Sequence, residues 1–193
     1  MAGGRGHRVH THRDGGITGL GAALTALALA DLATTGRIAG VVAACRGIVL
    51  ITVLVLVALP TARRGVRAPD LVAAAFAGAG LAIDQTAAAS RYAPQLVGST
   101  DLRGLHLLAA MLVGSAAVII GVRVRHATGV ALGTLGVAAV LLCGGAAHSA
   151  VVQPWYTGLL VAQALCGAAL ALAGWTGRHD PPGAAPDDRT RYP

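Results

Sequence analysis

Residues 38–59 read IAGVVAACRGIVLITVLVLVAL, an apolar run that only Arg46 interrupts with a charge. At 1.5 Å per residue, a run of this length crosses about 30 Å of hydrocarbon as a single helix. The rest of the chain has the same character, because 55% of its 193 residues are hydrophobic and only 12% are charged. Soluble domains carry roughly a quarter charged residues. The sequence therefore predicts an all-α, polytopic transmembrane helix bundle and excludes a soluble enzyme.

Apolar runs long enough to span a bilayer recur along the chain, and six of them are expected. They cover residues 17–34, 38–59, 71–90, 105–122, 128–151 and 156–175. These runs form one membrane domain, 17–177, between a basic tail with His and Arg, 1–16, and a polar tail, 178–193, that we expect to be disordered. An alternative interpretation assigns the first run to a cleaved signal peptide.

Arginine is distributed unevenly among the segments that flank the runs. The two tails and the second and fourth links together hold eleven arginines, whereas the remaining links hold three, Arg37, Arg91 and Arg103. Because cytoplasmic segments are enriched in Arg and Lys, we expect both termini to be cytoplasmic in a multi-pass protein of the bacterial cytoplasmic membrane. The net charge of +7 does not indicate nucleic acid as a partner, because the arginines cluster between apolar runs and not along one face.

Ionisable and amide side chains inside the expected spans are the candidate functional residues. Each charge near the bilayer centre costs at least about 2.5 kcal/mol and therefore needs a reason. These side chains are Asp31, Arg46, Asp84, Gln85, His106, His148 and Gln163. With the predicted orientation, the ionisable members of this set all lie in the outer half of the membrane. A purely structural ion pair between Arg46 and either Asp31 or Asp84 is the alternative interpretation.

Two histidines on neighbouring spans, His106 and His148, suggest a metal site, since imidazole is the commonest metal ligand. Asp84 would be a third ligand or would orient one imidazole ring. Asp31, Arg46 and Gln85 would form ion pairs or tune this site.

Other functions fit the same residues. In a haem- or quinone-binding redox subunit, His106 and His148 would be the axial ligands of haem b. A scaffold or accessory subunit would use its polar groups only to hold helices together. The sequence contains no GxSxG, HExxH or P-loop motif, so no catalytic residue is assigned and an enzyme is not expected.

The segments RGLHLLAAMLVG at 103–114 and QPWYTGLLVAQ at 153–163 resemble two helices of the membrane domain of the copper resistance protein D family. The resemblance covers residues 103–178. It implies copper binding or transport at the cytoplasmic membrane, and a membrane or extracytoplasmic metal chaperone as a partner beside the lipid bilayer. Among the candidate site residues, the resemblance assigns a family role to His106. Residues 153–158 match a family segment that marks the start of a helix.

Overall fold

The computed structural model describes residues 7–62, 65–92, 101–124 and 126–176, which are almost entirely helical. The helices are α1 (His7–Ala33), α2 (Gly36–Ala62), α3 (Ala68–Tyr92), α5 (Leu102–Arg123), α6 (Ala127–Ala147) and α7 (Gln153–Thr176). All six are long and apolar enough to cross a membrane. The predicted all-α fold with six spans is therefore confirmed.

The helix boundaries differ from the predicted spans at two places. Residues 7–16 were expected in a tail, but α1 begins at His7 and includes them. The fifth span was expected to reach 151, whereas α6 ends at Ala147 and His148 is its C-cap. The predicted tail 178–193 lies outside the described residues.

Local sequence explains several of the helix ends. Gly36 has a φ of +69°, a conformation that glycine adopts without strain, and it allows the short turn between α1 and α2. The carboxylate of Asp101 accepts a hydrogen bond from the backbone N–H of Arg103 at 3.0 Å and so caps α5. Pro154, the second residue of α7, is tolerated there because residues in the first helical turn have no acceptor within the helix, so the N–H that proline lacks is not missed.

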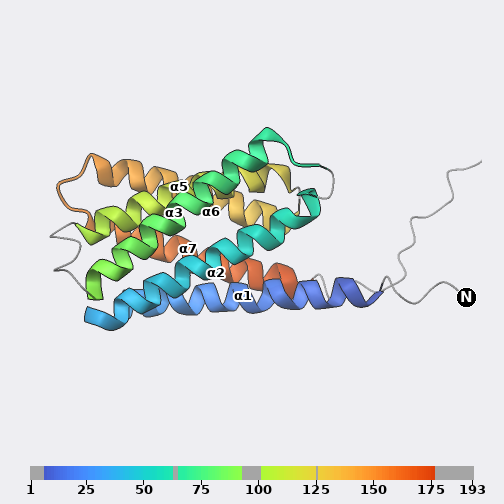
Figure 1. Cartoon of the computed structure of the whole chain (residues 1–193). Helices are drawn as coiled ribbons and strands as arrows, with labels where there is room; N and C mark the ends of the chain where they lie inside the picture. Colours follow the sequence, from blue (N-terminus) through green and yellow to red (C-terminus); the bar gives the residue numbers. More distant parts are fainter. Residues whose placement is uncertain (1–6, 63–64, 93–100, 125, 177–193) are drawn as a thin grey trace, which may run out of the picture.

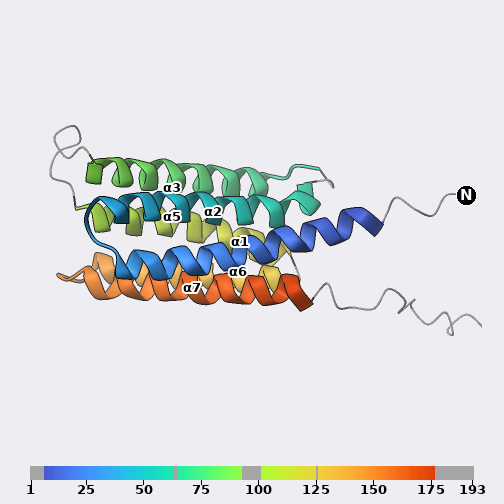
Figure 2. The same cartoon turned by 90° about the horizontal axis from the view of Figure 1, so that it is seen from below.

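The six helices form an up-and-down bundle in which each helix packs against its neighbours in sequence (Figures 1 and 2). α7 closes the ring by packing along α1, and α2 also approaches α5 across the middle. We call the end with the α1–α2 turn and the start of α7 the turn end. The opposite end, where α1 begins and α7 ends, is the tail end. The predicted cytoplasmic side of the termini stays a prediction.

Glycines let neighbouring helices touch backbone to backbone, mainly toward the tail end. A Cβ added to Gly21 of α1 would lie 2.6 Å from the backbone oxygen of Gly167 in α7. A Cβ on Gly121 of α5 would lie 2.7 Å from the backbone of Gly133 in α6. Small residues of this kind are typical of helix contacts in membranes, where van der Waals packing replaces the hydrophobic effect.

Large apolar side chains cover the outside of the bundle. Ile38, Val122, Leu141 and Leu165 are each about two-thirds exposed or more, although they come from different helices. Soluble proteins rarely expose so much contiguous apolar surface. This surface and the six apolar helices indicate an integral membrane protein in a lipid bilayer.

Candidate functional site

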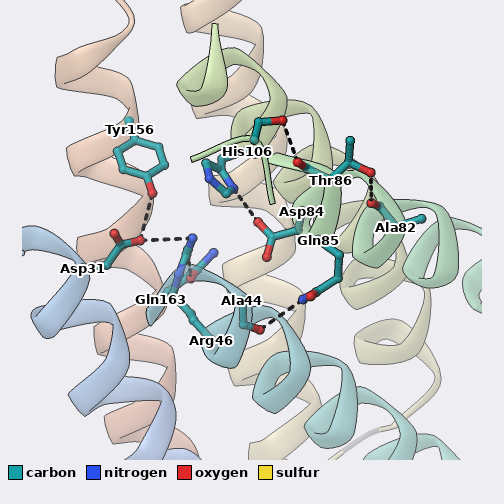
Figure 3. A network of polar contacts seen from close by, with 11 residues as sticks. Asp31, Ala44, Arg46, Ala82, Asp84, Gln85, Thr86, His106, Tyr156 and Gln163 are labelled. Atoms are coloured by element: carbon teal, nitrogen blue, oxygen red, sulfur yellow. Dashed lines mark hydrogen bonds and ion pairs between the residues drawn. The ribbon is translucent and has the colours of Figure 1, made fainter. Parts of the chain in front are cut away.

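The largest group of buried polar side chains lies in the turn-end half of the bundle. Its first part joins α1, α2 and α7 around Arg46 (Figure 3). Nη2 of Arg46 lies 3.3 Å from Oδ2 of Asp31, and Nη1 donates a 2.6 Å hydrogen bond to Oε1 of Gln163. The hydroxyl of Tyr156 donates a 2.8 Å hydrogen bond to the same Oδ2 of Asp31. Asp31 therefore has a charged partner and a neutral donor, although both ion-pair side chains are almost fully buried.

The second part of the network is a pair formed by α3 and α5. Nδ1 of His106 lies 2.6 Å from Oδ1 of Asp84, and the His106 side chain is fully buried. The imidazole ring also lies against Tyr156, with 6.2 Å between the ring centroids, which brings the two parts of the network together. Gln85 ties α3 to α2 by donating a 3.4 Å hydrogen bond to the backbone oxygen of Ala44.

A cavity of about 30 Å³ lies between the two parts, and Arg46, Asp84, His106 and Gln163 all line it. Three buried atoms of these residues have no hydrogen-bond partner among the described residues: Nε of Arg46, Oδ2 of Asp84 and Nε2 of His106. A buried polar atom without a partner costs about 1–3 kcal/mol. The cavity has room for one small polar species, such as a water molecule or an ion.

The absence of a side chain at Gly47 lets α2 lie close to the Asp84 carboxylate. A Cβ added to Gly47 would lie 2.5 Å from Oδ2 of Asp84, closer than a real Cβ could remain. Any larger residue at position 47 would therefore push the carboxylate toward α5. The glycine that follows Arg46 is thus part of the site's geometry.

The network descends from the turn end toward the middle of the bundle. At 1.5 Å per residue, His106 lies about 6 Å along α5 from its start, and Arg46 lies about 15 Å along α2. Asp31 is close to the end of α1, whereas Asp84 lies about 12 Å before the end of α3. The structure thus brings four of the ionisable residues selected from the sequence into one half of the bundle.

His148 is not part of this group. It is exposed at the C-cap of α6, where its backbone N–H bonds to the oxygen of Gly145. Within the described parts of the chain, no three His, Cys, Asp or Glu side chains come together as a ready metal site. Two of the thiols bond elsewhere: Cys143 donates to the backbone oxygen of Leu107 at 2.9 Å, and Cys166 approaches that of Ala131.

Sequence reasoning missed Tyr156 as a member of the network. Its hydroxyl is the neutral donor to Asp31, and its ring contacts His106. A signal was present, because an aromatic residue with a polar tip at the start of an apolar run is suited to reach buried polar groups. The partner of Arg46 could not be chosen between Asp31 and Asp84 from the sequence, and the structure shows Asp31.

Haem does not fit beside His106. The cavity that this residue lines has a volume of about 30 Å³, which is water-sized and far too small for a macrocycle. α5 and α6 also pack closely at this level, as the bond from Cys143 to Leu107 shows. A single ion is small enough for this cavity, and Nε2 of His106 is a buried nitrogen donor with no hydrogen-bond partner among the described residues.

Comparison with known proteins adds no relative to this description: no protein-family model, curated protein or solved structure matches the chain. The site must therefore be interpreted from its own geometry.

Proposed function

We propose that the protein is an integral membrane protein that binds one monovalent metal cation at His106, and that copper(I) is this cation. The observation that carries the proposal is the environment of the two ring nitrogens of His106. Its Nδ1 faces a carboxylate oxygen of Asp84 at 2.6 Å, while Nε2 is buried and has no hydrogen-bond partner among the described residues. A neutral imidazole in this position keeps its proton on Nδ1, so Nε2 presents a lone pair. Carboxylate, histidine and metal are arranged in this order in many metal sites.

The charges of the network favour a single positive charge. Arg46 is matched by Asp31, whereas the ionisable partner of Asp84 within the described residues is the imidazole of His106. With a neutral imidazole, two carboxylates and one guanidinium leave the network with one negative charge. A monovalent cation at Nε2 brings the sum to zero, but a divalent ion leaves an unmatched buried charge, which is costly.

The ligand atoms available at this site favour weak, reversible binding of copper over tight, permanent binding. Imidazole binds copper well, but copper(I) is held most tightly by thiolate and thioether sulfur. The two buried thiols, Cys143 and Cys166, are directed to the backbone oxygens of Leu107 and Ala131. An ion that one imidazole of the protein holds, with the Asp84 carboxylate acting through the ring, would exchange readily. Such a site suits binding or transport at the outer half of a bacterial cytoplasmic membrane, with a chaperone partner that delivers or removes the ion.

Copper stoichiometry of the purified protein tests this proposal. The detergent-solubilised full chain is titrated with copper(I) under reducing conditions, in competition with a chromogenic copper(I) chelator. We expect about one ion per chain, lost in His106→Ala and weakened about 10–100-fold in Asp84→Asn, which removes the orienting carboxylate. His148→Ala is the matched control and should bind like the wild type. Melting curves establish that the variants are folded.

Two results would overturn the proposal. One is a wild-type protein that binds no copper(I) in the presence of the chelator. The other is a folded His106→Ala variant that binds as much as the wild type. A parallel titration with zinc(II) should give weaker binding, since a second positive charge has no partner in the network.

A purely structural role is the second candidate, because the network joins five of the six helices. Asp31, Arg46, Gln163 and Tyr156 satisfy most of one another's hydrogen bonds, as groups that only hold helices together would do. In a scaffold or accessory subunit, the same substitutions would lower the melting temperature and no copper(I) would bind to any form.

A further inference from the structure

A second and much larger cavity opens at the turn end of the bundle. It has a volume of about 680 Å³ and is bounded by the α1–α2 turn, the end of α3 and the starts of α5 and α7. We call it the vestibule. Asp31 and Tyr156 of the polar network lie in its wall. Small-molecule sites usually have volumes of about 300–1,000 Å³, so the vestibule has the size of a ligand site.

Three arginines line the vestibule, and none has an ion-pair partner in the described part of the chain. They are Arg37 of α2, Arg91 of α3 and Arg103 of α5, of which Arg91 is half-buried. The carboxylates at this end are engaged elsewhere. Asp31 is held by Arg46, and Asp101, which does not line the cavity, caps α5.

Two of these arginines occupy positions that disfavour a positive charge. Arg37 and Arg103 are the second residues of α2 and α5. The first turn of a helix is the positive end of its dipole, where a cation is destabilising. An anion near these helix ends would reverse the sign of this effect.

Neutral polar groups complete the lining of the vestibule. Ser90, Thr157 and Gln153 lie in its wall, and Thr34 places there a buried hydroxyl that has no hydrogen-bond partner in the described part of the chain. Hydroxyl and amide groups of this kind orient a ligand that the charged groups attract.

We infer that the vestibule binds an anionic group, a phosphate or a carboxylate, through Arg37, Arg91 and Arg103. The half-buried guanidinium of Arg91 is the anchor, and the two exposed arginines approach the anion from α2 and α5. Arginine suits this task because its planar fork donates two parallel hydrogen bonds to either group. The anion is part of a small solute or of a lipid headgroup, which have this chemistry in common. The inference is independent of the proposed copper site.

Binding of inorganic phosphate and of anionic lipid tests the inference. Full-length protein in phosphatidylcholine nanodiscs is titrated with inorganic phosphate by calorimetry, and retention of phosphatidylglycerol is measured by native mass spectrometry. We expect saturable binding of one of these probes at one site per chain. Arg91→Gln should weaken it at least about tenfold, since a charged hydrogen bond contributes about 1.5–3 kcal/mol. The triple variant with Gln at 37, 91 and 103 should abolish it.

Arg67→Gln is the matched control, because Arg67 is an exposed arginine at the tail end. It should bind the probe as the wild type does. Binding of phosphate indicates a soluble anion, and retention of phosphatidylglycerol alone indicates a headgroup. A wild-type protein that binds neither probe would overturn the inference, and so would a folded triple variant that binds as strongly as the wild type.

Discussion

Removing the guanidinium of Arg46 should destabilise the bundle strongly, because it leaves the buried Asp31 carboxylate with only one neutral donor, Tyr156. Removing one partner of a buried ion pair costs about 3–5 kcal/mol. The lost hydrogen bond to Gln163 adds about 1 kcal/mol. Arg46→Met should therefore lower the free energy of unfolding by about 4–6 kcal/mol. Asp31→Asn alone should cost about 3–5 kcal/mol, since it strands the positive charge instead.

The double variant distinguishes a charge effect from the loss of packing. Arg46→Met with Asp31→Asn removes both charges and keeps a group that can accept from Tyr156. It should cost only about 1–2 kcal/mol, the value of the lost neutral hydrogen bonds. Unfolding in mixed detergent micelles, followed by circular dichroism, measures all four proteins. A coupling of at least about 3 kcal/mol is expected.

The control for this cycle combines Asp31→Asn with Arg123→Met. Arg123 lies at the tail end and pairs with Asp70, so the two changes share no partner. Their costs should add to within about 0.5 kcal/mol. If Arg46→Met and Asp31→Asn also prove additive, the ion pair does not stabilise the network in the way argued here.

Three further substitutions test other parts of the structure. Gly47→Ala should displace the carboxylate of Asp84, and we expect copper(I) affinity to fall about 10–100-fold in the chelator assay with little loss of fold. Gly121→Leu should force α5 away from Gly133 and lower the free energy of unfolding by about 1–3 kcal/mol or more in the micelle assay, because an overpacked contact cannot relax. Arg123→Ala should cost less than about 1 kcal/mol in the same assay, since its ion pair is partly exposed at the end of the bundle.

Sequence alone predicts the depth of the polar residues but not their partners. Hydropathy fixes the six spans, and the alternating direction of successive spans fixes which end of the bundle each residue approaches. Asp31, Arg46, Asp84 and His106 could therefore be assigned to one half. Their pairing depends on the rotation of each helix about its axis, which small apolar residues barely constrain. For this reason the choice of Asp31 over Asp84 as the partner of Arg46 required the structure.

The same reasoning explains why His148 was placed in the site. The apolar run extends to position 151, which predicts that His148 is buried near the end of a span. In the structure, α6 stops at Ala147 and leaves the imidazole exposed. Hydropathy measures how apolar a segment is and does not show where its helix ends. The convergence of the vestibule arginines could not be predicted from the sequence, because it depends on how the α1–α2 turn, the end of α3 and the start of α5 lie relative to one another.

The vestibule and the copper site should influence each other, because Asp31 and Tyr156 belong to both the vestibule wall and the network. Three unmatched guanidinium groups give the turn end a positive potential, which opposes a cation at His106. An anion in the vestibule removes part of this potential. Saturating phosphate should therefore raise copper(I) affinity, and copper(I) should raise phosphate affinity by the same factor. Couplings of this kind amount to about 1–3 kcal/mol, or roughly 5–150-fold.

Chelator competition with and without phosphate measures the effect. The triple arginine variant should bind copper(I) tightly and show no dependence on phosphate. If the wild type binds both ligands but neither affinity depends on the other, the two sites are not coupled through their charges.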